Sequence, residues 1–309
     1  MPTGRFAPSP TGPLHVGNLR TAVLAWLFAR SSGSRFVLRI EDLDRVASRP
    51  ELVRSQLDDL RALGIDWDGE VVHQSDRFPL YDRALAQLER DGDLYPCYCT
   101  RREVVAAAAA PHGPSPEGAY PGMCRDLTPA ERAACEAEGR RAALRVRAGG
   151  AKVDVEDRLA GWTTAVVDDF VVRRNDGVAA YQLAVVVDDA DQGIEEVVRG
   201  DDLLGTTPRQ VWLAERLGLP RPAYAHVPLV LGPDGNRLAK RHGAVTLGDL
   251  VAAGVGVPDV LGALAASLGL AAPGERVRSV RDLIDRFDPA DLPRDPWVFD
   301  PSELVERCA

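Results

Sequence analysis

The stretch RFAPSPTGPLHVGN, residues 5–18, decides how this chain folds, because it joins a short apolar strand to a helix through a loop rich in proline. The prolines restrict φ, and Gly12 and Gly17 let the backbone turn sharply or lie close to a ligand. The run TAVLAWLFA at 21–29 is apolar on all sides and predicts a buried helix. His15 then lies near the positive helix end, which favours an anion such as a nucleotide triphosphate. The alternative is an ordinary connection with an incidental histidine.

The next residues alternate between strand and helix patterns. RFVLRI at 35–40 predicts a parallel strand that ends at Glu41. Ser48 and Glu51 form a predicted capping box for a helix that ends at Gly64. This β–α–β–α order favours a parallel sheet, whose ligands bind at the carboxyl ends of its strands. Glu41 should therefore lie beside the 5–18 segment.

Similar patterns predict the later elements. Each is bounded by caps, turns or strand-forming residues. They comprise helices opened by the capping boxes Thr100/Glu103 and Thr128/Glu131, strands at 143–146 and 165–174, a hairpin turn at Asp176–Gly177, a strand ending at Arg199, a helix at 208–217, a strand at 226–231 and short helices after about 247.

Composition limits the classes of function. The 309 residues have a formal net charge of −9, which argues against non-specific coating of nucleic acid or membranes but allows a local basic patch. No secretory signal or apolar run of membrane-spanning length is visible, so we expect a cytoplasmic protein with no membrane partner.

The cysteines are clustered. Cys97 and Cys99 lie before a loop rich in proline and glycine, and Cys124 follows it, whereas the other two cysteines, Cys135 and Cys308, stand apart. Such a cluster favours metal binding or free thiols over disulfides. Three thiolates and one further ligand can hold Zn²⁺ tetrahedrally, and chemistry alone nominates His112 as the fourth. The alternative is a group of partly buried thiols.

A phosphate-binding lysine is the remaining candidate. The sequence has no Walker-type loop, and the pair Gly254 and Gly256 lacks the context of a dinucleotide fingerprint. Lysine occurs only at Lys152 and Lys240, although arginine is common. A lysine on the late loop therefore suggests that a compact point charge is needed there. Chance variation in a surface loop is the alternative.

Together these segments resemble the class I aminoacyl-tRNA synthetases in their glutamyl form. Residues 5–18 resemble the first signature of that family, and RLAKR at 237–241 resembles the second, a mobile lysine loop. The blocks LRIEDLDR, AYQLAVVVDD and VVRGDDLL between them are similar to glutamyl-specific blocks, so the resemblance covers about residues 3–250. Two positions depart from the pattern: Asn18 replaces a histidine, and only the second lysine of the loop is kept, as Lys240.

The resemblance implies an interrupted Rossmann-like α/β fold with a parallel sheet. Residues 1–94 and 196–246 would form the two halves of the catalytic domain. Residues 95–195 would form an inserted zinc-binding α/β subdomain that contacts the acceptor. Residues 247–309 would form a short helical C-terminal region without an anticodon-binding domain.

The implied chemistry is attack of the glutamate α-carboxylate on ATP, with Mg²⁺ leaving on the pyrophosphate. Such a reaction needs positioning and charge neutralisation rather than a side-chain nucleophile. The catalytic residues would be His15 and Lys240. The resemblance implies an ATP site of Pro8, Gly12, His15, Gly17, Asn18, Arg237 and Lys240, with adenine against the bare backbone of Gly17. It implies a glutamate site of Arg5, Phe6, Ala7, Pro8, Ser9, Glu41, Tyr181 and Arg199.

Charge supports the glutamate assignment. Glu41 can pair with the α-ammonium group, while Arg199, helped by Arg5, can bind the side-chain carboxylate and reject glutamine. The alternative for Arg199 is an ion pair with Asp201 or Asp202. Two other acidic residues, Asp42 and Asp44, are better explained as solvated loop residues or helix caps.

The family also suggests the metal ligands and the acceptor. It nominates Tyr120 as the fourth ligand of a single structural zinc, in competition with His112. Because the chain stops at Ala309, soon after the lysine loop, it resembles the glutamyl-queuosine tRNA(Asp) synthetases. That resemblance implies a monomer that activates glutamate without tRNA and esterifies it to queuosine in the anticodon arm of tRNA(Asp). The alternatives are glutamylation of a tRNA 3′ end or another acceptor, and a non-catalytic paralogue that binds glutamate or RNA.

Overall fold

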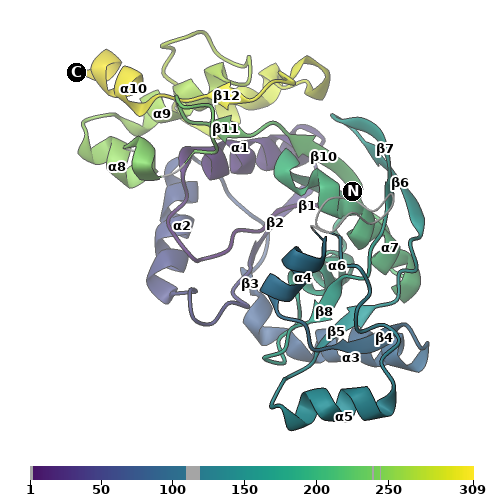
Figure 1. Cartoon of the computed structure of the whole chain (residues 1–309). Helices are drawn as coiled ribbons and strands as arrows, with labels where there is room; N and C mark the ends of the chain where they lie inside the picture. Colours follow the sequence, from purple (N-terminus) through teal and green to yellow (C-terminus); the bar gives the residue numbers. More distant parts are fainter. Residues whose placement is uncertain (1–2, 109–118, 239, 244) are drawn as a thin grey trace.

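A seven-stranded, mostly parallel sheet forms the centre of the computed structural model, which describes residues 3–108, 119–238, 240–243 and 245–309. The side chains of residues 108 and 240 are also outside the description. Neighbouring strands are parallel except for the β6–β7 pair (Figure 1). The strands in spatial order are β3 (Val72–His73), β2 (Arg35–Ile40), β1 (Thr3–Phe6), β9 (Glu196–Gly200), β10 (Ala223–Val227), β6 (Lys152–Asp157) and β7 (Gly161–Val166).

The first strand lies between segments that are far apart in sequence. β1 pairs with β2 on one side and with β9 on the other, where Gly4 is in register with Glu196. The parallel pairing places the carboxyl ends of β1, β2 and β9 at one edge. Arg5, Glu41 and Arg199 lie at or beside these ends, so three of the residues predicted to bind the substrate glutamate meet there.

The predicted buried helix is confirmed as α1 (Val16–Ser31), with His15 as its N-cap. Its side chains are buried almost all round, including fully buried Leu19 and Trp26. A Cβ on Gly4 would lie 3.1 Å from that of Ala29, so glycine allows β1 to approach the helix closely.

The predicted capping box at Ser48 is wrong. α2 (Pro50–Ala62) begins at Pro50, and its N-cap, Arg49, makes no side-chain cap. Proline disfavours helical backbone in the preceding residue and suits the first helical position, so the helix begins at Pro50 and leaves Ser48 outside it. The end predicted at Gly64 is confirmed, because the helix finishes at Ala62 and Gly64 has a φ of +81°.

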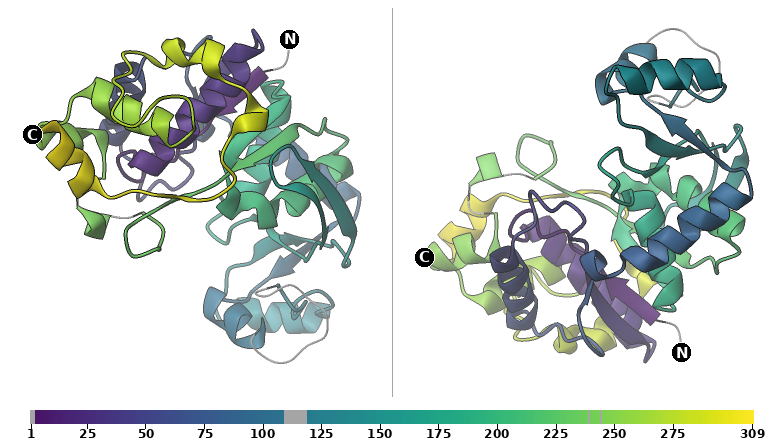
Figure 2. Two further views of the ribbon diagram at one scale, coloured as in Figure 1. Left: turned by 90° about the horizontal axis from the view of Figure 1, so that it is seen from above. Right: turned by 90° about the horizontal axis from the view of Figure 1, so that it is seen from below.

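Residues between β3 and β9 contribute to two sheets. The main sheet takes the β6–β7 hairpin, and a second, antiparallel sheet has the order β4 (Leu94–Cys97), β5 (Ala143–Val146) and β8 (Val171–Arg173). Both predicted capping boxes are present, at α4 (Arg101–Ala108) and α5 (Pro129–Ala137). The part that carries α4 and α5 projects from the main body (Figure 2). The single strand predicted at 165–174 is two strands, because β7 ends at Val166 and β8 begins at Val171.

The strand predicted at 226–231 is also divided. β10 ends at Val227, and β11 (Val230–Leu231) pairs in parallel with β12 (Trp297–Val298), which the sequence did not predict. Pro228 lies at the break, where a residue without an N–H group cannot donate to a ladder. The remaining elements are η1 (Gln74–Asp76), α3 (Phe78–Arg90), α6 (Tyr181–Asp191), η2 (Asp201–Thr206), α7 (Thr207–Leu217), η3 (Lys240–His242), α8 (Leu247–Ala252), α9 (Val257–Ala266), η4 (Val280–Arg286), η5 (Pro289–Asp291) and α10 (Pro301–Cys308).

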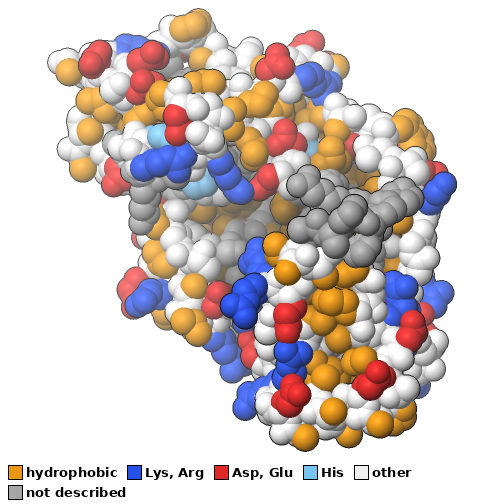
Figure 3. All heavy atoms as spheres, viewed as in Figure 1, with side chains coloured by type: hydrophobic (Ala, Val, Ile, Leu, Met, Phe, Trp, Pro, Cys, Tyr) orange, Lys and Arg blue, Asp and Glu red, His pale blue; other side chains and the backbone are white. Residues whose placement is uncertain are grey.

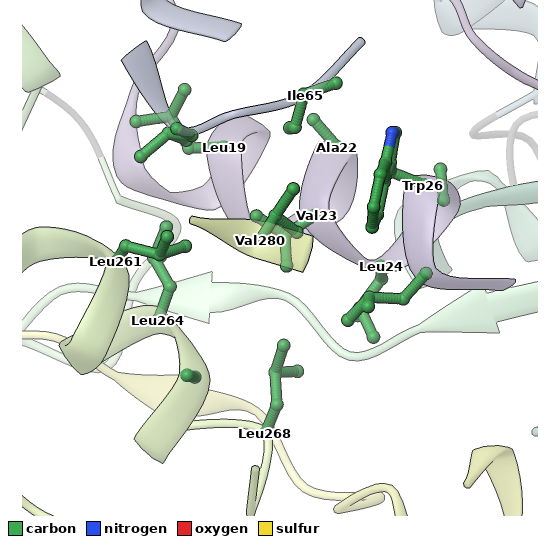
Figure 4. Packing of buried hydrophobic residues seen from close by; sticks show 14 of the residues in the cluster. Leu19, Ala22, Val23, Leu24, Trp26, Ile65, Leu261, Leu264, Leu268 and Val280 are labelled. Carbon is green, nitrogen blue, oxygen red and sulfur yellow. The ribbon is translucent and has the colours of Figure 1, made fainter. Parts of the chain in front are cut away.

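The C-terminal elements share a hydrophobic core with α1. Leu261, Leu264 and Leu268 face α1 together with Val280 (Figure 4). None of the described helices has the length and apolar character needed to cross a membrane.

Candidate active site

A cavity of about 650 Å³ opens at the carboxyl ends of β1, β2 and β9. Figure 3 shows basic side chains on both sides of the central hollow of this face. The side chain of Lys240 is outside the described residues, so its predicted place is not seen. The cavity is lined by the other residues predicted for ATP and glutamate: Arg5, Phe6, Ala7, Pro8, Ser9, Gly12, His15, Gly17, Asn18, Glu41, Tyr181, Arg199 and Arg237.

His15 and Asn18 hold each other at the start of α1. The backbone N–H of His15 donates to Asn18 Oδ1 at 3.1 Å, and that of Asn18 donates to His15 Nδ1 at 3.3 Å. Because Nδ1 accepts a hydrogen bond, the proton of the neutral ring is on Nε2. Burial lowers the pKa of His15 below 6.5, and the charge of Arg237 lowers it further. His15 is therefore a neutral donor at a helix N-terminus.

A buried side chain of α2 holds the loop of the first signature in place. Gln56 of α2 is almost fully buried, and its Nε2 donates to the carbonyls of Gly12 at 2.7 Å and Ser9 at 3.1 Å. A Cβ on Gly17 would lie 2.9 Å from His15 Cε1 and 3.0 Å from Nδ1. Glycine at position 17 therefore makes room for the imidazole ring, a role that the sequence did not predict.

Buried charges surround the carboxylate of Glu41. Arg39 is fully buried, and its Nη2 lies 3.3 Å from Glu41 Oε1 while its Nη1 lies 2.8 Å from Asp189 Oδ1. Asp189 also accepts from Arg5 Nε at 3.4 Å. Burial raises the pKa of Glu41, and Arg39 and Arg5 oppose this rise. The result is an acidic group on the cavity wall beside two cations.

Arg199 is held by neutral partners. Its Nε donates to His226 Nε2 at 3.0 Å, its Nη2 to Thr207 Oγ1 at 2.8 Å and its Nη1 to Tyr181 Oη at 3.5 Å. Asp202 pairs instead with Arg237 at 2.8 Å. Within the described parts of the chain Arg199 forms no ion pair, so the alternative of a pair with Asp201 or Asp202 is wrong.

Of the two other acidic residues after β2, Asp44 has the local role that was expected, whereas Asp42 is not a solvated loop residue, because its side chain is 15% exposed and bonds to Ser75. Asp42 accepts from Ser75 N and Oγ, both at 2.8 Å, and Asp44 accepts from the backbone N–H groups of Val46 and Ala47. Neither lines the cavity.

The predicted metal ligands form a second cluster. The Sγ atoms of Cys97, Cys99 and Cys124 all lie within 4.8 Å of one another. Tyr120 Oη lies 3.4 Å from Cys97 Sγ and 3.7 Å from Cys99 Sγ, and it accepts the backbone N–H of Cys124 at 2.8 Å. Four donor atoms from one short region thus converge, which fits a tetrahedral zinc. His112 lies outside the described residues.

A cation faces this cluster. Arg145 donates from Nε to Cys97 Sγ at 3.2 Å, and its guanidinium carbon lies 3.7 Å from the centre of the Tyr120 ring. Burial alone would raise the pKa of Cys97, but hydrogen bonds with Tyr120 and Arg145 lower it below the usual thiol value. Burial raises the pKa of Cys99 to about 12. The positive charge suits a group of anionic ligands.

Several functional positions escaped the sequence analysis. Arg39 and Asp189 lie inside the blocks LRIEDLDR and AYQLAVVVDD but were not singled out, and Thr207 and His226 contact Arg199 without a motif of their own. The available signal was polarity inside apolar elements, as with Arg39 in RFVLRI and the aspartates that end AYQLAVVVDD.

Comparison with known proteins shows which sequences and structures this chain is similar to. The profile for "tRNA synthetases class I (E and Q), catalytic domain" matches residues 3–305. A Nocardia farcinica protein named "Glutamyl-Q tRNA(Asp) synthetase" is 59% identical over 98% of this chain and 94% of its own length. A protein of the same name from Symbiobacterium thermophilum is 53% identical over 99% and 98%. The crystal structure of a glutamate tRNA ligase from Elizabethkingia meningosepticum in complex with its amino acid has a TM-score of 0.82 at 26% identity, covering 98% of this chain and 68% of that one.

Proposed function

The chain belongs to the class I glutamyl and glutaminyl tRNA synthetases, and we propose that it activates L-glutamate with ATP and transfers it to queuosine in tRNA(Asp). The observation that carries activation is that one cavity brings together His15, Glu41 and Arg199 from three segments. The acceptor is inferred from the names of two relatives that are 59% and 53% identical along nearly their whole length.

In the first step an α-carboxylate oxygen of glutamate attacks the α-phosphorus of ATP. The new O–P bond forms as the bond to the β-phosphate bridge breaks, and pyrophosphate leaves with Mg²⁺. His15 would donate from Nε2 to a phosphate oxygen, and the N-terminus of α1 adds its partial positive charge. Lys240 of the lysine loop would neutralise charge that grows on the phosphates.

Glutamate is recognised by charge at both ends. The carboxylate of Glu41 would pair with the α-ammonium group, and Arg199 with Arg5 would bind the side-chain carboxylate. Tyr181 lies at Arg199 and would border the same pocket. The amide of glutamine would offer an acceptor to one N–H of Arg199 and place its own donor against another, which disfavours its binding.

In the second step a hydroxyl of the queuosine cyclopentenediol attacks the carbonyl of glutamyl-adenylate, and AMP leaves. The anticodon arm of tRNA(Asp) would then enter the cavity that related enzymes use for an acceptor end. Activation without tRNA, a monomeric state and a cytoplasmic location remain predictions of the same kind.

The cysteine cluster would hold one structural zinc. We assign Cys97, Cys99 and Cys124 as three ligands and Tyr120 as the fourth, because its oxygen lies beside two of the sulfurs. The metal would hold the loop after β4 against the second sheet. It would take no part in the reaction.

Transfer assays with radiolabelled glutamate test this proposal. Purified tRNA(Asp) with queuosine should accept label on the modified nucleoside, whereas the same tRNA lacking queuosine should accept almost none. Equal labelling of both would contradict the acceptor, and label on the 3′-terminal adenosine would instead favour an ordinary charging enzyme.

Glutamate-dependent exchange of pyrophosphate into ATP, without tRNA, tests activation itself. Lys240→Ala should lower the exchange rate far more than it changes the KM for glutamate. Lys152→Ala, which removes the other lysine of the chain from an exposed position on β6, is the control. An unchanged rate in Lys240→Ala would show that the lysine loop is misassigned.

A further inference from the structure

We infer that His226, Asp157 and Thr207 position the guanidinium of Arg199 so that two N–H groups, one on each terminal nitrogen, are left for the side-chain carboxylate of the amino acid. This inference rests on the proposed function, because it assumes that glutamate binds at Arg199. It adds that residues outside the cavity set the preference for glutamate over glutamine.

Three neighbouring strands carry the arrangement. Arg199 on β9 is in register with His226 on β10, and Asp157 ends β6 on the far side of β10. The side chains of His226 and Asp157 are fully buried. Neither residue lines the cavity, so both act through Arg199.

Asp157 fixes the proton of the imidazole. One carboxylate oxygen lies 2.6 Å from His226 Nδ1, and the carboxylate also accepts the backbone N–H groups of His226, Leu159 and Ala160. An ionised carboxylate only accepts, so the imidazole proton must lie on Nδ1. His226 Nε2 is therefore an acceptor, as the Nε–H donor of Arg199 requires.

Thr207 fixes the other side of the guanidinium. Its Oγ1 accepts from Arg199 Nη2 at 2.8 Å and lies 3.1 Å from the carbonyl oxygen of Leu203. The threonine is fully buried at the start of α7, so the hydroxyl has little freedom to move away. The hydrogen bonds of Nε to His226 and of Nη2 to Thr207 thereby keep the guanidinium group from turning out of this orientation.

Counting donors shows what remains for a ligand. A guanidinium has five N–H groups. His226 takes the one on Nε, Thr207 one on Nη2 and Tyr181 one on Nη1. One N–H is left on each terminal nitrogen, and Arg199 lines the cavity. Two donors in this geometry match the two oxygens of a carboxylate, whereas a glutamine amide would place its own donor against one of them.

Paired substitutions test the positioning role. Thr207→Val removes the acceptor at Nη2 with little change in shape, and Thr207→Ser keeps the hydroxyl. His226→Asn can still donate to Asp157 but lacks the acceptor at Nε2, whereas His226→Gln places an amide oxygen near the Nε2 position.

Glutamate-dependent pyrophosphate exchange should separate these variants. Thr207→Val and His226→Asn should raise the KM for glutamate roughly 10-fold or more, since each leaves a donor of a charged group unpaired. Their KM for ATP and their kcat should stay within about twofold of the wild-type values, because neither residue touches the nucleotide part of the cavity. Their preference for glutamate over glutamine should fall. Thr207→Ser and His226→Gln should recover most of the affinity.

The outcomes are distinct. An unchanged KM for glutamate in both Thr207→Val and His226→Asn would overturn the inference, as would equal losses for glutamate and ATP, which indicate general damage. Calorimetric titration with glutamate alone measures the same difference without catalysis. A wild-type protein that binds glutamate but exchanges no pyrophosphate would contradict the proposed function, while weaker binding by the variants would still support the inference. If His226→Asn does not fold, the Thr207 pair decides.

Discussion

At the scale of single residues, the imidazole of His15 depends on a neighbour that has no side chain. Gly17 is two residues further along, and a methyl group there would lie 2.9 Å from His15 Cε1 and 3.4 Å from the Cβ of Val230. The ring would have to leave the position in which Nδ1 accepts from Asn18 N.

Gly17→Ala should therefore lower the rate of pyrophosphate exchange by at least roughly tenfold, the cost of misplacing one phosphate donor. Gly248→Ala is a matched control, because Gly248 occupies the same second position of the capped helix α8. Among the described residues, a methyl group there meets only Thr246, at 4.0 Å. Thermal unfolding measured on both variants shows whether folding is affected. Equal exchange rates in the two variants would contradict the role assigned to Gly17.

The residues that sequence reasoning found and those it missed differ in one physical respect. His15, Glu41 and Arg199 belong to segments with a readable pattern. By contrast, His226 and Asp157 are 69 residues apart, and Arg39 and Asp189, although each lies in a recognisable block, pair across 150 residues. Their roles come from contacts across strands and helices, which no local pattern encodes.

At the scale of elements, the start of α1 couples stability to the nucleotide site. The Asn18 side chain accepts the N–H of His15 and completes the cap. Asn18→Ala should lower the free energy of unfolding by about 1 kcal/mol, as measured by denaturant titration.

Asn18→Asp separates the cap from the site. An aspartate keeps the acceptor and adds a negative charge at a helix N-terminus, so stability should equal or exceed that of the wild type. The same charge would repel a triphosphate, so the KM for ATP should rise. A KM for ATP that stays constant in this variant would place the phosphates away from α1.

The cysteine cluster is predicted to bind one structural zinc and so to stabilise the segment after β4. Metal analysis should find about one zinc per chain, as expected for a single four-ligand site. Cys124→Ser should lose the metal and unfold at a lower temperature, whereas Cys135→Ser, on α5, should keep the metal and the wild-type unfolding temperature.

The identity of the fourth ligand has a test of its own. Competition with a chelator should show weaker zinc binding in Tyr120→Phe and unchanged binding in His112→Ala. The reverse order would make His112 the fourth ligand.

Elements were predicted where local chemistry dominates. The capping boxes of α4 and α5 are confirmed because each needs only residues three apart. The helix start predicted at Ser48 was wrong because Pro50 takes the first helical position, which leaves Ser48 outside the helix. The break at Pro228 could have been read from the proline itself, whereas β12 was missed because its pairing with β11 joins residues from distant parts of the chain.

At the scale of the whole molecule, the C-terminal elements complete the core of the catalytic part. Arg20 of α1 is buried and donates to the Ser267 hydroxyl and carbonyl after α9 and to the Pro228 carbonyl. Val16 N also donates to Val245 O at 2.8 Å. Of these three contacts, the one with Ser267 lies beyond residue 247, so the helix that carries His15 is held in part by the C-terminal elements.

Leu264 provides a test of this dependence. It is fully buried on α9 in the cluster that includes α1, so Leu264→Ala should lower the free energy of unfolding by about 2–5 kcal/mol. Because the two regions share one core, denaturant should abolish circular dichroism and pyrophosphate exchange in a single, earlier transition. Val251→Ala, at a half-exposed position on α8, should change stability by less than about 0.5 kcal/mol. If Leu264→Ala kept full exchange activity beyond a first unfolding step, α1 would owe its stability to the parallel sheet alone, and the C-terminal elements would be a separate folding unit.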